Sequence, residues 1–125
     1  MPVFVLFDAD GHIHNESQRP RHEKDNKALM PLLEINEPPF PVGNLFSANY
    51  AIWETNLTKT VRADFPEADF SRITDAARQR YGHEGGLEKN DLFIADWLTA
   101  AHREGFRSGT LTRLCQSMIT FAQTL

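Results

Sequence analysis

One short apolar segment near the start constrains the fold of this chain more than any other feature. Val3–Phe7 is β-branched, aromatic and aliphatic, with no polar alternation. Such a segment predicts a strand that is buried on both faces, as in the centre of a parallel sheet. Asp8-Ala9-Asp10-Gly11 follows directly and predicts the end of that strand. We therefore expect an α/β chain whose small, mostly parallel sheet contains this strand.

The rest of the sequence predicts few strands and several helices. A second strand is expected over 50–53, whereas Leu45-Phe46 predicts only a short extended piece, and the proline-rich segment 36–43 predicts a loop. Residues 83–86 predict a break, and Trp53 and Trp97 are expected in the core. Apolar residues at helical spacing predict four to five helices, over 21–34 (with Ala28, Leu29, Leu32 and Leu33 as the apolar face), 54–65, 70–81, 89–104 and 110–123.

Composition and charge narrow the possible function classes. The 125 residues are enough for a single domain, and a 41% hydrophobic and 24% charged composition argues against disorder. The net charge of −4 argues against a protein that coats DNA through a basic face, but a metal-dependent enzyme concentrates acids at its site. Val3–Phe7 is too short to cross a bilayer and has no basic flank like that of a signal peptide. We expect a cytoplasmic protein without a membrane segment.

The single cysteine excludes two kinds of small stabilised fold. Cys115 alone can form neither an internal disulfide framework nor a zinc cluster of several thiolates. It lies among the apolar residues of the segment 110–123, so we expect its side chain to be buried and unreactive.

The predicted elements imply a shortage of strands. One or two strands are expected in this chain, and a two-stranded sheet is marginal at best. A single buried strand cannot satisfy its own backbone hydrogen-bonding groups. Three explanations stay open: further strands escape the sequence pattern, the chain is the later part of a larger domain, or a partner completes the sheet.

Asp8 and Asp10 are the strongest local sign of chemistry. They follow a predicted sheet strand at its carboxyl end, which is the usual ligand-binding edge of an α/β domain. Residues two apart in a strand point the same way, and two facing carboxylates repel unless a cation lies between them. Oxygen ligands of this kind suit Mg²⁺ or Mn²⁺, although an acidic turn after a strand is the simpler alternative. His12 and His14 could extend such a site, but histidines in a polar loop are more often solvated.

The aspartate pair resembles the motifs of two enzyme families. Phe7-Asp8-Ala9-Asp10-Gly11 resembles the opening motif of haloacid-dehalogenase-type phosphatases, in which Asp8 would be the nucleophile and Asp10 the general acid/base. It also resembles the Asp-x-Asp motif of TOPRIM domains, in which both acids hold metal. The phosphatase pattern lacks its downstream half, because the chain after Trp53 predicts helices and Asp96 lies inside an apolar helix pattern.

Further segments, in order along the chain, resemble the carboxyl-terminal part of the TOPRIM domain in OLD-family ATP-dependent endonucleases. The resemblance spans nearly all of the 125 residues. The segments that carry it are the Asp-x-Asp strand over 3–10, Lys24–Leu29 opening a helix, Trp53-Glu54 with Leu57, Asp64-Phe65, Glu88-Lys89-Asn90 opening another helix, and a last helix with Leu111, Leu114 and Ile119.

The resemblance implies a residue-by-residue assignment. Asp8 and Asp10 would bind Mg²⁺ or Mn²⁺, and Glu54 would complete the metal cluster. Lys89 would lie near the scissile phosphate, where a point cation stabilises developing charge. The alternative for Glu54 is an acid in the first turn of a helix, and for Lys89 it is a solvated lysine. Ile52 stands where the family often has a small hydroxyl residue.

The resemblance also implies that the chain is a partial domain. The front of a TOPRIM domain, with its catalytic glutamate, and the ATPase module that precedes it find no counterpart in the sequence, and Gly85-Gly86 lacks the residues of a Walker motif. We therefore expect residues 1–125 to be a partial TOPRIM domain of a DNA endonuclease, weakly active alone and partnered by DNA and by a chain with the ATPase module.

Two alternatives to this reading stay open. One is a phosphatase with Asp8 as nucleophile, and the other is a non-catalytic truncated chain that needs a partner. Arg78, Arg80 and His83 could meet a phosphate backbone, but residues of this kind more often form a solvated helix end.

Overall fold

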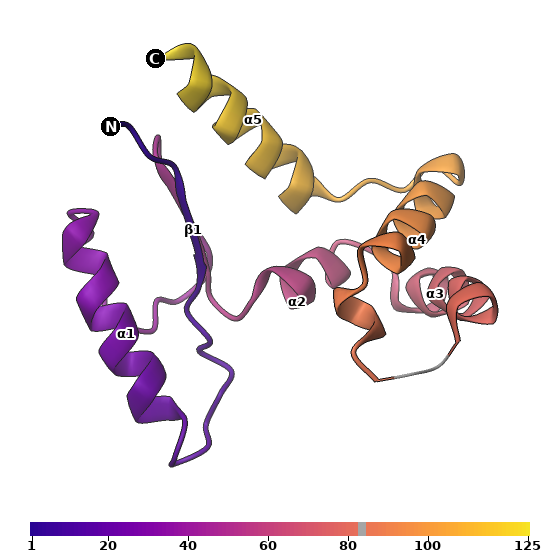
Figure 1. Cartoon of the computed structure of the whole chain (residues 1–125), viewed down its shortest axis with the longest axis horizontal. Coiled ribbons are helices and arrows are strands. Elements are labelled where there is room, and N and C mark those ends of the chain that lie inside the picture. The colour runs from indigo at the N-terminus through magenta and orange to yellow at the C-terminus, as the bar shows by residue number, and fades with distance from the viewer. Residues whose placement is uncertain (83–84) are drawn as a thin grey trace. The chain divides into compact units, whose positions relative to one another are not determined.

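A computed structural model describes residues 1–82 and 85–125 (Figure 1). The predicted break over 83–86 includes His83 and Glu84, which lie outside the described residues. The described residues form a mixed α/β chain with a three-stranded sheet and five α-helices, which confirms the α/β part of the predicted fold class. The expected sheet of one or two mostly parallel strands has instead three strands, joined by one parallel and one antiparallel pairing. The elements are β1 (Val5–Asp8), α1 (Arg19–Leu32), β2 (Leu45–Phe46), β3 (Tyr50–Trp53), α2 (Leu57–Arg62), α3 (Glu67–Tyr81), the short 3-10 helix η1 (Leu87–Lys89), α4 (Asp91–Arg103) and α5 (Gly109–Gln123).

The sheet has the strand order β1-β3-β2. β1 runs parallel to β3, with Val5 opposite Tyr50 and Asp8 opposite Trp53, whereas β2 is antiparallel to β3. The prediction that the first strand is central and buried on both faces was wrong, because β1 is an edge strand and its Leu6 is 43% exposed. The central strand is β3, which pairs on both sides. The antiparallel pairing of β3 with β2 makes Leu45-Phe46 a third strand, whereas the sequence predicted only a short extended piece there.

The contacts group the chain into two compact units, residues 1–60 with 111–125 and residues 61–110. In the first unit the sheet has a core on each face. Ile52 packs with Ala9, Met30 and Ile35 on one face. On the other face, Ala51, Trp53 and Leu114 form a second cluster. Helix α1 therefore covers one face through Met30, and α5 covers the other through Leu114. The prediction of one partial TOPRIM domain over 1–125 stays a prediction.

Helix α1 buries a different face from the predicted one. Leu29 and Leu32, which were expected to form its apolar side, are 38% and 79% exposed. The residues it buries are Asn26 and Met30. The reason is physical: the loop after β1 has backbone carbonyl oxygens without strand partners, and a polar helix face satisfies them.

The second unit is built around helices α3 and α4 and an aromatic cluster. The Trp97 ring lies edge-on to Phe65 and Phe70, with centroid distances of 5.6 and 5.3 Å. The side chain of Asn90 caps α4 by accepting a hydrogen bond from the Phe93 N–H. Trp97 is 8% exposed and Trp53 in the first unit 1%, so both tryptophans are core residues as predicted.

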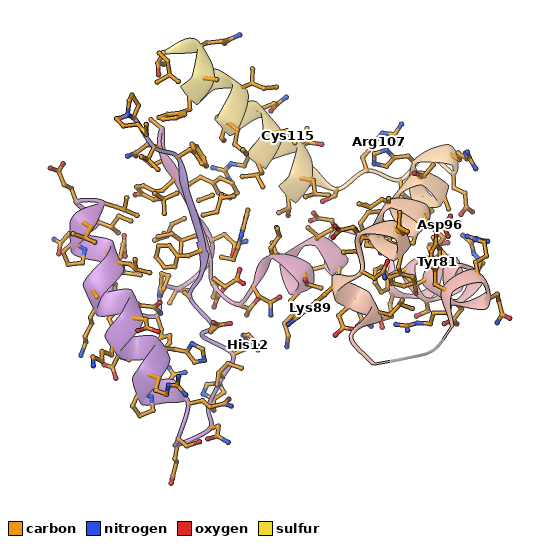
Figure 2. All side chains as sticks on the ribbon, in the orientation of Figure 1. His12, Tyr81, Lys89, Asp96, Arg107 and Cys115 are labelled. Atoms are coloured by element: carbon orange, nitrogen blue, oxygen red, sulfur yellow. The ribbon has the colours of Figure 1, made fainter. Side chains whose placement is uncertain are left out.

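Cys115 departs from its prediction. Its side chain is exposed on α5 (Figure 2). The preceding residue, Leu114, is buried in the core, and Cys115 is not, because successive helical residues point about 100° apart. Among the described residues, no helix is long and apolar enough to span a membrane.

The buried amide of Asn26 should matter for stability. Asn26→Leu removes the donor for two carbonyl oxygens and should lower the free energy of unfolding by about 2 kcal/mol. Asn26→Asp should cost more, because a carboxylate oxygen would then face those oxygens. Urea denaturation followed by circular dichroism measures both, and Asp25→Ala on the exposed side of α1 is the control. Wild-type stability in Asn26→Asp would contradict the assignment.

Asp64 should give the second unit an acid-sensitive stability. Burial alone would raise the pKa of Asp64, but hydrogen bonds from Ser108 and Thr110 outweigh it and lower the pKa below 3.8. The Ser108 hydroxyl donates over 2.6 Å and the Thr110 N–H over 3.0 Å to Asp64 Oδ2. A lowered carboxyl pKa stabilises the fold above the ordinary pKa, and this stability is lost as pH falls through the lowered value.

Asp64→Asn should therefore cost about 1 kcal/mol at pH 7, a modest value because the carboxylate is largely exposed. The difference from wild type should shrink in acid below the lowered pKa. Urea midpoints measured across this range test the prediction, with Asp75→Asn on α3 as the control. A difference that stays constant with pH would count against it.

Candidate active site

Asp8 and Asp10 lie at the carboxyl end of β1, where the chain stays attached to β3 beyond the strand. The Ala9 N–H donates to the Trp53 carbonyl over 2.8 Å, and the Asp10 N–H donates to the Thr55 carbonyl over 2.9 Å. The backbone of the aspartate segment is therefore fixed by the residues that lead from β3 into α2.

The Asp8 carboxylate has a mixed environment. The Leu57 N–H, at the start of α2, donates to Asp8 Oδ1 over 3.0 Å. Burial, together with the negative charge of Asp10, raises the pKa of Asp8 above 3.8, against the opposing effects of the Leu57 N–H and of His12. The ionised form of Asp8 is thus disfavoured, which is common for carboxylates that hold a cation or take part in catalysis.

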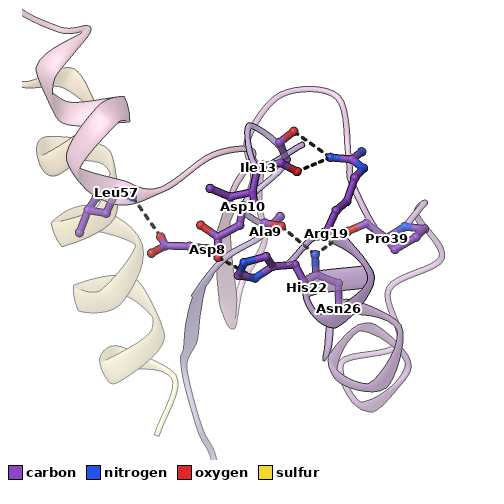
Figure 3. A network of polar contacts seen from close by, with 10 residues as sticks. Asp8, Ala9, Asp10, Ile13, Arg19, His22, Asn26, Pro39 and Leu57 are labelled. Atoms are coloured by element: carbon purple, nitrogen blue, oxygen red, sulfur yellow. Dashed lines mark hydrogen bonds and ion pairs between the residues drawn. The ribbon is translucent and has the colours of Figure 1, made fainter. Parts of the chain in front are cut away.

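Asp10 stands in a different backbone conformation. Its φ of 56° is left-handed, a region that Asp occupies more readily than most residues. The strand ends at Asp8, so strand alternation does not explain how the two acids come together. They are nevertheless close enough that the charge of Asp10 raises the pKa of Asp8. Asp10 Oδ2 lies 3.3 Å from His22 Nδ1 on α1 (Figure 3).

Gly11 allows the aspartate turn to approach the end of β3 closely. Its N–H donates to the Glu54 carbonyl over 2.9 Å. A Cβ atom at position 11 would stand only 2.9 Å from that same oxygen. The glycine in Asp-x-Asp-Gly is therefore required by the close approach of two backbones.

Helix α1 holds the aspartate segment from the other side. The fully buried Asn26 amide donates to the Ala9 carbonyl over 2.9 Å and to the Pro39 carbonyl over 2.8 Å. Arg19 donates to the carbonyl oxygens of Gly11 and Ile13 over 3.2 and 2.9 Å. Figure 3 shows these contacts converging from α1 on the loop after β1.

Sequence reasoning missed these α1 residues. Arg19, His22 and Asn26 have the spacing i, i+3, i+7, which places them on one face of the helix. The sequence contains this spacing, but the three residues are polar, so apolar periodicity does not reveal the face that they form. The segment Lys24–Leu29, expected to open the helix, lies in its middle, since α1 begins at Arg19.

Glu54 directly follows β3, and its backbone carbonyl contacts the aspartate segment through the Gly11 N–H, but its side chain is engaged elsewhere. The Gly43 N–H donates to Glu54 Oε2 over 3.0 Å, and the Glu54 N–H donates to Asn44 Oδ1 over 2.8 Å. The carboxylate thus holds the turn before β2. Its role as a metal ligand stays a prediction.

The two loop histidines differ. His12 Nδ1 is buried without a hydrogen-bond partner among the described residues. His14 is exposed. His12 acts electrostatically on Asp8, so its buried nitrogen belongs to the same neighbourhood as the aspartate pair.

The predicted cationic residues belong to the second unit. Lys89 is exposed in η1, and its role at a phosphate stays a prediction. Arg78 lies over the Phe93 ring at 5.3 Å, and Arg80 forms an ion pair with Asp96. His83, the third residue of the proposed phosphate-facing group, lies outside the described residues.

The arrangement offers two coupled carboxylates to a cation. No three His, Cys, Asp or Glu side chains of the described residues surround one point as a ready metal cluster. Mg²⁺ usually keeps several waters and needs only one or two protein carboxylates. The mutual repulsion of Asp8 and Asp10, with the orphaned nitrogen of His12 nearby, therefore fits a hydrated divalent ion.

The raised pKa of Asp8 predicts a stabilising substitution. A carboxyl whose pKa is raised in the folded state stabilises the fold below the ordinary pKa of 3.8, and this contribution is lost as pH rises through the folded value. Asp8→Asn stays neutral and can still accept from Leu57. We expect Asp8→Asn to be more stable than wild type at pH 7, by less than about 1 kcal/mol because the site is partly solvated.

Thermal unfolding in buffer with a chelator at pH 3 and pH 7 tests this expectation. The advantage of Asp8→Asn should appear only at pH 7. A variant less stable than wild type at pH 7 would show that Asp8 serves mainly as the helix cap.

Comparisons of this chain with protein-family models, with curated proteins and with solved structures find no match. The contacts of Asp8, Asp10 and their neighbours therefore carry the functional inference.

Proposed function

We propose that this chain is part of a metal-dependent DNA endonuclease, with Asp8 and Asp10 as its metal-binding carboxylates. One observation carries the proposal: Asp8 and Asp10 lie at the carboxyl end of a parallel strand, close enough that the charge of Asp10 disfavours ionised Asp8. A divalent cation between the two carboxylates would offset this repulsion. Asp8 and Asp10 also stand in the order and spacing of the Asp-x-Asp motif of TOPRIM domains of the OLD type.

The chemistry follows from the class of ion. When bound, one or two Mg²⁺ or Mn²⁺ ions supply an activated water and stabilise the leaving oxygen of a phosphodiester. The residues of this chain hold and orient the ion: Asp8 from the end of β1, and Asp10 from the left-handed turn that follows. The buried nitrogen of His12, which has no hydrogen-bond partner among the described residues, would accept a hydrogen bond from a water on that ion.

Glu54 and Lys89 are the two further residues that the proposal includes. Glu54 is exposed and its carboxylate is held by one backbone N–H, so rotation toward a cation sacrifices a single hydrogen bond. Lys89 is an exposed point cation and would act on the phosphate instead of the metal. DNA and a chain carrying an ATPase module are the proposed partners.

The proposal predicts that metal binding depends on the aspartate pair. Asp8→Asn and Asp10→Asn should each weaken Mn²⁺ binding at least about tenfold, since each removes a charged oxygen ligand. Electron paramagnetic resonance of free Mn²⁺ measures the affinity on the full chain. Asp25→Asn, an exposed acid on α1, is the matched control and should bind as wild type does.

Nicking of supercoiled plasmid in Mn²⁺ then tests the reaction itself. Any nicking by the isolated chain should be weak, and it should disappear in Asp8→Asn and fall in Lys89→Ala. Unchanged Mn²⁺ affinity in both aspartate variants would refute the metal site. Turnover of p-nitrophenyl phosphate with a phosphoryl group trapped on Asp8 would instead establish the phosphatase alternative.

A further inference from the structure

Helix α1 contributes one residue that touches a proposed metal ligand directly. Arg19 and Asn26 bind backbone oxygens of the aspartate segment, whereas His22, between them on the same helix face, contacts the carboxylate of Asp10. Arg19 and Asn26 therefore fix the backbone of the segment, whereas His22 contacts the Asp10 side chain.

The backbone of Asp10 is held on both sides. Its N–H donates to the Thr55 carbonyl over 2.9 Å, and its carbonyl accepts from the Ile13 N–H over 3.0 Å. With the backbone fixed, the freedom that remains to Asp10 is rotation of its side chain. Oδ2 of that carboxylate lies 3.3 Å from His22 Nδ1.

The contact is also partly shielded from solvent. The side chains of Asp10 and His22 are 26% and 33% exposed, whereas each other ion pair in the described part of the chain has a basic side chain that is more than half exposed. A carboxylate held through one oxygen leaves its second oxygen available to a ligand, and partners behind a ligand commonly set its orientation.

We propose that His22 is a positioning residue for Asp10, selecting the side-chain rotamer in which Asp10 can bind a divalent cation. This inference rests on the proposed function and deepens it. His22 itself need not touch the ion: its ring supports one carboxylate oxygen, and the other oxygen of Asp10 faces the ion held jointly with Asp8.

Substitutions at His22 test the inference on the full chain with Mn²⁺ as the probe. His22→Phe keeps a ring of similar size without a donor and should weaken Mn²⁺ binding about tenfold, the lower end of losses seen for residues behind metal ligands. His22→Gln retains an N–H donor and should restore most of the affinity. His14→Phe, in the exposed part of the loop, should bind as wild type does.

A structural role alone would not produce this pattern. If His22 served only the fold, His22→Phe and His22→Gln would lose thermal stability together, and the affinity of the folded fraction would be unchanged. Rescue of binding by Gln but not by Phe, at equal melting temperature, supports positioning. Wild-type affinity in His22→Phe, with binding still lost in Asp10→Asn, overturns the role of His22 and leaves the metal site intact.

A measurement without substitution keeps the inference testable should the variants fail to fold. In the unmodified chain, saturating Mg²⁺ should shift the ring ¹⁵N signals of His22 and leave those of His14 in place. An unmoved His22 signal at a Mg²⁺ concentration that shifts Asp8 and Asp10 overturns the proposal. Binding of Mg²⁺ that shifts none of these residues refutes the metal site itself.

Discussion

The first unit depends on one buried amide. Asn26 donates from α1 to the carbonyl oxygens of Ala9 and Pro39, and so joins the end of β1 to the proline-rich loop. Neither oxygen has a partner in a strand ladder, and a buried carbonyl without a donor is costly. A side chain with two N–H groups solves this for two loops at once. Asn26 thereby fixes where the aspartate segment leaves the sheet.

The same segment is held from the sheet side by backbone contacts with residues after β3. The turn at Asp10 and Gly11 has little conformational freedom, because it is hydrogen-bonded to α1 on one side and to the residues after β3 on the other. That rigidity allows two carboxylates to stay close although their charges repel, since the cost is met by the surrounding contacts. Asp8 and Asp10 thus lie close together because α1 and the residues after β3 hold their backbone in place.

The sequence predicted some elements far better than others, for identifiable reasons. Helices α3, α4 and α5 follow apolar periodicity because each packs an apolar face, as Trp97 in α4 and Leu114 in α5 illustrate. The apolar face of α1 was wrongly predicted because its buried face is polar around Asn26. The central position given to β1 was also wrong, since a hydrophobic run records burial but not the order of strands, and its Leu6 is partly exposed.

The site was predictable only in part. Asp8 and Asp10 were expected to lie close together, and they are electrostatically coupled. The expected reason, strand alternation, does not apply, because β1 ends at Asp8 and Asp10 stands in a left-handed turn. The contact of His22 with Asp10 depends on the tertiary placement of α1 on the loop, which no local pattern encodes. The engagement of Glu54 with Gly43 likewise arises from the turn before β2.

Asp8 links this site mechanically to the next helix. Its Oδ1 atom accepts a hydrogen bond from the Leu57 N–H, so the carboxylate that is electrostatically coupled to Asp10 also holds the first turn of α2. A ligand that binds both oxygens of Asp8 would have to break this hydrogen bond, and the first turn of α2 would then fray. Ligand binding at the end of β1 and the order of the first turn of α2 would in this way depend on the same hydrogen bond.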